Sequence, residues 1–161
     1  ENTKTKQDNQ QVIHKAYGAT ALGVLVTERF IYFLQVGDGD ILTVFDDNNE
    51  ITVSRPILND IDMIANETHS LCEKNSAKKI KTSMIFKDQK YPKLIMMSTD
   101  GYSNAFENEK DYDKVAIDLY NMIKQGKEHV IKQNIIDWLN EASKYTGDDI
   151  SIGLIYNKSS N

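Results

Sequence analysis

The chain has 161 residues, which is room for one domain with one hydrophobic core. Hydrophobic residues make up 40% and charged residues 27%, a balance typical of a folded protein rather than a disordered one. The net charge of −5 argues against a broad nucleic-acid-binding or anionic-membrane-binding face. The single cysteine, Cys72, excludes an internal disulfide and favours a reducing, cytoplasmic location. No apolar run approaches the roughly 18 residues needed to cross a bilayer.

The hydrophobic patterning divides the chain into one domain with two short ends. Residues 1–12 are polar and lack the apolar stretch of a secretory signal, so we expect a disordered or cut N-terminal segment. Residues 13–157 carry the pattern of a folded domain, and residues 158–161 form a polar tail.

The N-terminal half predicts a series of β-strands. The expected strands span residues 18–26, 30–36, 41–45 and 51–54. The second of these is almost wholly apolar, which is typical of a strand covered on both faces. Gly37-Asp38-Gly39-Asp40 predicts a tight turn, since glycine supplies positive φ and aspartate bonds its own backbone. We therefore expect this region to be a meander of hairpins.

The C-terminal half predicts strands followed by helices and one returning strand. Residues 57–77 are mixed, with one short helix and a loop expected, and strands follow at 80–86 and 94–98. Two apolar stripes at helical spacing then indicate two helices, which end at Gly126 and before Gly147. The stripe residues are Val115, Leu119, Met122 and Ile123 in the first helix, and Ile131, Ile135, Trp138, Leu139 and Ala142 in the second. A last strand is expected at 150–156, beside earlier ones, and the order favours an α+β fold with a largely antiparallel sheet or sandwich.

Carboxylates stand at the ends of two strands expected to be buried. Asp100 follows strand 94–98, and Asp148 and Asp149 precede strand 150–156. If the two strands are neighbours, Asp100 and Asp148 converge on one edge of the sheet. Converging carboxylates with no basic residue close in sequence are the oxygen ligands that Mg²⁺ or Mn²⁺ prefers. Turn and capping chemistry explains the same residues without a metal, and both interpretations stay open at this point.

Other candidate sites are weaker. Asp38-Gly39-Asp40 begins like a calcium-binding loop, but the required glycine at the sixth position is missing. The three histidines, His14, His69 and His129, lie far apart without the spacing of metal ligands.

Several segments, taken together, resemble the metal-dependent protein phosphatases of type 2C. The family's Gly-x-Thr strand is similar to residues 17–22 (Tyr-Gly-Ala-Thr-Ala-Leu), and its Val-Gly-Asp-Ser-Arg hairpin is similar to residues 36–40 (Val-Gly-Asp-Gly-Asp). Its Ser-Asp-Gly motif matches residues 97–101 (Met-Ser-Thr-Asp-Gly), and its closing Asp-Asn-Ile-Thr motif matches residues 147–151 (Gly-Asp-Asp-Ile-Ser). The likeness is closest to a bacterial branch, where Asn-Glu-Thr-x-Ser-Leu, here residues 66–71, also occurs. The resemblance covers about residues 16–157.

The resemblance implies roles for individual residues. Asp100 and Asp148 would be ligands of Mg²⁺ or Mn²⁺, with Gly101 beside them, and Asp149 stands where the family has asparagine. Thr20 and Asp38 would be supporting residues near the site rather than ligands. In the family, two such ions activate a water that attacks phosphoserine or phosphothreonine of a phosphoprotein, without a covalent intermediate. The implied architecture is a β-sandwich flanked by helices, in αββα layers.

The family's N-terminal motifs do not occur in this chain. They are an Arg-x-x-x-Glu-Asp segment and an Asp-Gly-His-Gly-Gly segment, which supply the bridging aspartate and the phosphate-binding arginine. The resemblance therefore implies the C-terminal part of a phosphatase domain, without the N-terminal strands and one helical layer. We expect such a part to have little activity and weak metal affinity alone, and to form a homodimer or associate with the missing N-terminal part. The alternative is a non-catalytic, phosphatase-like module that binds a partner protein.

Overall fold

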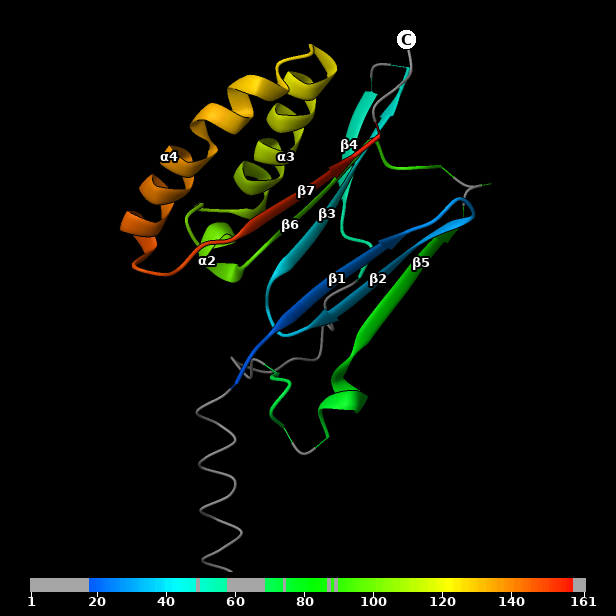
Figure 1. Cartoon of the computed structure of the whole chain (residues 1–161), viewed down its shortest axis with the longest axis vertical. Helices are drawn as coiled ribbons and strands as arrows, with labels where there is room; N and C mark the ends of the chain where they lie inside the picture. The colour runs from blue at the N-terminus through cyan, green and yellow to red at the C-terminus, as the bar shows by residue number, and fades with distance from the viewer. Residues whose placement is uncertain are drawn as a thin grey trace, which may run out of the picture.

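The protein consists of two antiparallel sheets and a layer of helices, so the predicted α+β class is confirmed (Figure 1). The computed structural model describes residues 18–48, 50–57, 69–73, 75–86, 88 and 90–157. A three-stranded sheet has the order β1-β2-β5, with β1 Ala21–Val26, β2 Phe30–Val36 and β5 Lys81–Phe86. A four-stranded sheet has the order β4-β3-β6-β7, with β4 Glu50–Ser54, β3 Asp40–Asp47, β6 Leu94–Ser98 and β7 Ile152–Tyr156.

Alternating side chains of the four-stranded sheet build two separate cores. Ile41 and Ile95 pack toward the three-stranded sheet, against Ile31 and Phe33 of β2. The residues that alternate with Ile41 and Ile95 along β3 and β6 pack on the other face of the sheet, against the helices, because successive strand residues point to opposite faces. This second group consists of Leu42, Val44, Leu94 and Met96.

Two long helices cover the outer face of the four-stranded sheet, as Figure 1 shows. Helix α3 spans Glu109–Lys124 and begins at Asn108, whose side chain accepts a hydrogen bond from the Asp111 N–H at 3.1 Å. Helix α4 spans Glu128–Thr146 and ends at Gly147 with a φ of 75°, as its sequence predicts. The single turn α2, Asp100–Ser103, links β6 to α3.

The buried faces of both helices differ in detail from the predicted stripes. In α3 the fully buried positions are Tyr112, Ala116, Leu119 and Tyr120, so only Leu119 of the predicted stripe lies among them. Two tyrosines are buried here because Tyr112 and Tyr120 find hydrogen-bond partners in Ser98 and Asp46. In α4, Ile131 is buried while Trp138 is exposed and is not part of the core cluster that Ile135, Leu139 and Ala142 pack against.

The predicted hairpin at residues 37–40 is wrong, because this turn is a corner between the two sheets. It joins β2 of the three-stranded sheet to β3 of the four-stranded sheet. Gly37 has a φ of 98°, and a Cβ there would lie 2.6 Å from the Cβ of Thr20. Glycine is therefore required both for the backbone conformation and for the close approach of β1. The hairpins β1-β2 and β3-β4 are as predicted.

The outer face of the three-stranded sheet is apolar and exposed. Leu25, Tyr32 and Met84 form one row across the strands, and Phe30 pairs with Phe86 in the next. Leu25 is 55%, Met84 41% and Phe86 50% exposed. A sheet face in water normally carries polar residues, so this exposed apolar face is unusual.

Three expectations concern parts of the chain outside the described residues. The predicted N-terminal segment, its limit near residue 12 and the predicted tail fall on residues 1–17 and 158–161, which lie outside the described residues. Most of segment 57–77 also lies outside the described residues. Within that segment the structure describes one short 3₁₀ helix, η1, at Ser76–Lys79. No helix of the described part is both long and apolar enough to span a membrane.

Candidate active site

The pairing of β6 with β7 brings the predicted carboxylates to one end of the four-stranded sheet. Ser98 lies opposite Ile152 in the antiparallel register, so the end of β6 meets the start of β7. Beyond the ladder, the Thr99 N–H donates to the Ser151 carbonyl at 3.1 Å, and the Ser151 N–H donates to the Thr99 hydroxyl at 3.0 Å. These bonds extend the pairing up to Asp100 on one side and Asp149 on the other. The condition for this convergence, that the two strands are neighbours, is therefore met.

Gly101 lets the segment around Asp148 approach the start of α2. A Cβ on Gly101 would lie 3.1 Å from the Asp148 Cβ, 3.1 Å from the Asp149 carbonyl oxygen and 3.3 Å from the Asp148 Cγ. Ordinary contacts begin near 3.4 Å. The glycine thus allows the side chain of Asp148 to pack directly against the backbone next to Asp100.

Asp38, which comes from the corner between the sheets, joins Asp100 and Asp148 in a group of three carboxylates that we call the acidic cluster. The pKa of Asp100 is raised above its usual value by partial burial, then by the negative charge of Asp38, and less by that of Asp148. The Gly101 N–H, which donates to Asp100 Oδ1 at 2.9 Å, opposes this shift. Three strand ends therefore place carboxylates close enough to repel one another.

Within the described residues, none of the ion pairs involves Asp100 or Asp148. Their side chains accept hydrogen bonds from the next residue's backbone, Gly101 and Asp149, at 2.9 and 2.8 Å. In the same part of the chain, no group of three or more His, Cys, Asp or Glu side chains forms a complete metal-binding cluster. The donors present are hard, anionic oxygens, which suit a divalent cation with further ligands from water or other groups.

Loop 69–73 holds the segment that packs against the corner at residues 37–40. The Ala19 N–H donates to the Ser70 hydroxyl at 2.9 Å, and the Leu71 N–H donates to the Ala19 carbonyl at 2.9 Å. Thr20 follows Ala19 and lies against Gly37. Thr20 is therefore a packing residue beside the corner that carries Asp38.

The comparison with known families decides the identity. Residues 1–140 match the family model described as protein phosphatase 2C. The chain belongs to this family. Comparison with curated proteins gives no match. Membership of the protein phosphatase 2C family makes a phosphatase the class of enzyme expected for the chain. The matched range includes Asp38 and Asp100, while Asp148 and Asp149 lie beyond it.

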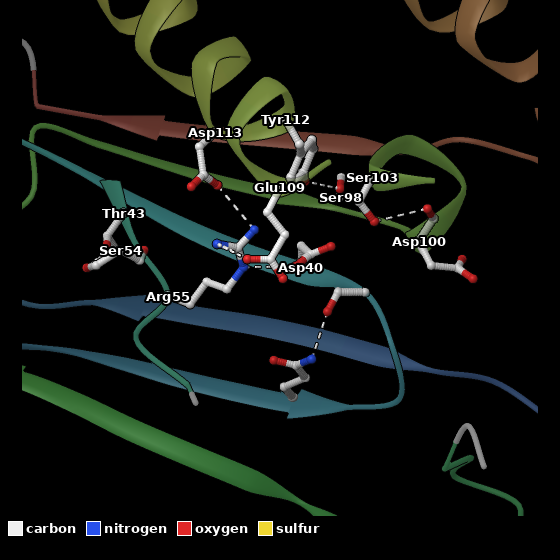
Figure 2. Close-up of polar contacts among 12 residues, drawn as sticks. Asp40, Thr43, Ser54, Arg55, Ser98, Asp100, Ser103, Glu109, Tyr112 and Asp113 are labelled. Carbon is white, nitrogen blue, oxygen red and sulfur yellow. Dashed lines mark hydrogen bonds and ion pairs between the residues drawn. The ribbon is translucent and has the colours of Figure 1, made fainter. Parts of the chain in front are cut away.

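The structure of this protein phosphatase 2C chain also contains polar contacts that sequence reasoning missed (Figure 2). Arg55, just after β4, is paired with Asp40, Glu109 and Asp113. The Ser98 and Tyr112 hydroxyl oxygens lie 2.6 Å apart in the core. The only sequence signal for Arg55 is the scarcity of arginine, because its partners lie 15 to 58 residues away.

One cavity of the described part of the domain lies away from the acidic cluster. It has a volume of about 450 Å³ and opens between the sheets, beside Val26, Tyr91 and Tyr156. These residues stand at the end of β1, before β6 and at the end of β7. The cavity is therefore at the opposite end of the sandwich, and the chemistry of the site is assigned from the carboxylates alone.

Proposed function

We propose that the chain carries the C-terminal motifs of a metal-dependent phosphatase that hydrolyses phosphoserine and phosphothreonine in proteins. The observation that supports this most is the convergence of Asp100, Asp148 and Asp38 at one sheet end. Partial burial, and then the negative charges of Asp38 and Asp148, raise the pKa of Asp100, and neither Asp100 nor Asp148 takes part in a described ion pair. A bound Mg²⁺ or Mn²⁺ would supply a compensating positive charge.

In this proposal Asp100 and Asp148 hold the metal, and Asp38 adds negative charge beside it. A divalent ion held by these residues would lower the pKa of a water and offset negative charge on the phosphoryl oxygens. Gly101 keeps the two ligands together by allowing close packing. Asp149 orients Asp148, because its N–H donates to Asp148 Oδ1 at 2.8 Å.

Neither arginine of the chain is placed to bind the phosphate. Arg55 is paired with three carboxylates. Arg29 is exposed in the β1–β2 turn, at the other end of the strands from Asp38. An arginine contact to the phosphate would thus have to come from outside these 161 residues, which supports little activity of the chain alone.

The test compares two lengths of protein on a phosphothreonine peptide. The protein with any residues encoded before Glu1 is expected to release phosphate only with Mn²⁺ or Mg²⁺, and Asp100→Asn is expected to lower kcat/KM at least a thousandfold. The 161-residue chain alone is expected to be far slower. Metal-independent hydrolysis, or full activity of Asp100→Asn, would contradict the proposal.

A non-catalytic module that binds a partner protein is the second candidate. The exposed apolar row of Leu25, Tyr32 and Met84 favours it, because such a surface is typical of protein contacts. This candidate predicts that the longer protein binds the phosphopeptide or a partner without releasing phosphate at any metal concentration.

A further inference from the structure

Arg55 is the centre of a half-buried group of charges that it forms with carboxylates of β3 and α3 (Figure 2). Its Nη2 lies 3.1 Å from Asp113 Oδ1, and its Nε lies 3.5 Å from Asp40 Oδ1. The side chains of Arg55, Asp40 and Asp113 are only 20%, 18% and 27% exposed. A third carboxylate, the exposed Glu109, lies 3.9 Å from Nη1. Burial alone would lower the pKa of Arg55, but these carboxylates raise it, so the guanidinium stays charged.

Asp40, one partner of Arg55, is part of the corner that carries Asp38. It is the first residue of β3 and lies opposite Ser98 in the register with β6, two residues before Asp100. The corner has one further tie, since Gln35 Nε2 donates to the Gly39 carbonyl at 2.7 Å and the Gly37 carbonyl at 3.3 Å. Fixing Asp40 therefore fixes the chain on the C-terminal side of Asp38.

Asp113, the other strong partner, belongs to α3, which also contacts the end of β6. Its neighbour Tyr112 places its hydroxyl oxygen 2.6 Å from Ser98 Oγ. One turn of α3 thus makes a hydrogen bond to β6 through Tyr112. The same turn is linked through the ion pairs of Arg55 to Asp40, at the start of β3. The two strand ends that carry Asp38 and Asp100 are tied to the same rigid helix.

The positive charge of Arg55 is paired with Asp40, Asp113 and Glu109, and not with the carboxylates of Asp100 and Asp148. It compensates Asp40, which lies two residues from Asp38 and would otherwise add a further negative charge there. Asp100 and Asp148 have no such described ion pair. A cation that binds at the acidic cluster would therefore not have to displace a described ion pair from Asp100 or Asp148.

We propose that Arg55 is a positioning residue, which anchors Asp40 to α3 and so holds the Asp38 corner in place for cation binding at the acidic cluster. This role rests on the proposed metal-dependent function. Residues that hold metal ligands in place from outside the ligand shell commonly change metal affinity 10- to 100-fold when replaced.

The first measurement is Mn²⁺ binding to the full 161-residue chain, followed by the EPR signal of free Mn²⁺. Arg55→Ala is expected to weaken binding about tenfold, and Arg55→Lys about threefold, because one ammonium cannot span both carboxylates. Asp113→Asn removes the nearest carboxylate of α3 from Arg55, so it is expected to weaken Mn²⁺ binding in the same direction as Arg55→Ala, by about threefold, and to lower the thermal midpoint. Arg29→Ala, at the exposed arginine, is the matched control and is expected to change neither quantity.

The second measurement is amide hydrogen exchange without metal, which separates this proposal from the proposed function. Arg55→Ala is expected to speed exchange at residues 37–40 and not in the β1–β2 hairpin. Asp40→Asn should do the same, and it serves as the test if Arg55→Ala does not fold. If neither the unaltered chain nor the longer protein binds Mn²⁺, the proposed function fails, while exchange still decides the role of Arg55. Unchanged Mn²⁺ affinity together with unchanged exchange at residues 37–40 would overturn the positioning role and leave Arg55 as a structural link to α3.

Discussion

Replacing Gly101 with alanine is expected to weaken Mn²⁺ binding at least tenfold while the protein stays folded. The added Cβ would lie 3.1 Å from both the Asp148 Cβ and the Asp149 carbonyl oxygen. Since ordinary contacts begin near 3.4 Å, the segment at 148–149 must move away from α2 by a few tenths of an ångström. A binding site needs its groups held within about 0.5 Å, so a shift of a few tenths of an ångström uses up much of that tolerance and weakens the hold of the two carboxylates on one ion.

The fold is expected to tolerate the same change. Alanine is favoured over glycine in a helix by about 1 kcal/mol, and overpacking costs about 1 to 3 kcal/mol in a rigid core. Asp148 and Asp149 are exposed, so they can move and the cost falls at the low end of that range. The net change in the free energy of unfolding is therefore expected to be within about 1 kcal/mol.

The assay is an EPR titration of Mn²⁺ with the 161-residue chain, together with thermal unfolding. Gly23→Ala is the matched control, because its added Cβ would meet Leu34 at an ordinary 3.6 Å on the outer face of the three-stranded sheet. The control is expected to bind Mn²⁺ like the unaltered chain. Equal affinity of Gly101→Ala and the unaltered chain would refute the reasoning, since it would show that the approach of Asp148 to Gly101 is irrelevant to the ion.

Three further outcomes follow from the structure. The pKa of Asp100 is raised in the folded protein, so its ionisation destabilises the metal-free fold as the pH rises above about 4. Asp100→Asn should therefore raise the thermal midpoint at pH 7 by about 1 to 3 °C without metal, because partial exposure keeps the effect below about 1 kcal/mol. The same change should abolish Mn²⁺ binding. A lowered thermal midpoint would contradict the expected direction. Tyr112→Phe removes the buried hydrogen bond to Ser98 and should lower the free energy of unfolding by about 1 to 2 kcal/mol in a urea titration, whereas an unchanged value would mean that water replaces the bond. Met84→Lys, on the exposed apolar face, should reduce self-association of the chain in sedimentation velocity, and unchanged sedimentation would show that this face makes no contact between copies.

Local patterns were sufficient to predict the strands and helices. Apolar alternation and the stops at Gly126 and Gly147 marked elements that the structure places within a few residues of the expected limits. The position of Asp100 and Asp148 at strand ends was also predictable, because it follows from where buried runs end and begin. That the two strands are neighbours was only a condition, which the register of β6 with β7 meets.

The parts that failed depend on contacts between distant residues. The turn Gly37-Asp38-Gly39 has the composition of a hairpin, and only the packing of β3 against β6 shows that it crosses between sheets. Arg55 lies next to Pro56 in a segment without periodicity, so nothing local indicates its partners on α3. Buried tyrosines such as Tyr112 were missed because hydrophobic patterning takes no account of a hydroxyl that finds a partner.

The most direct test of the central claim is paramagnetic line broadening by Mn²⁺ in the ¹H–¹⁵N spectrum of the isotope-labelled chain. If Asp100 and Asp148 share one ion, the amide signals of residues 100–101 and 148–149 should broaden first and together, at the same Mn²⁺ concentration. Asp148→Asn should then protect both pairs of signals, including those beside the unaltered Asp100. Broadening of one pair without the other, or broadening around Asp100 that persists in Asp148→Asn, would contradict a shared site.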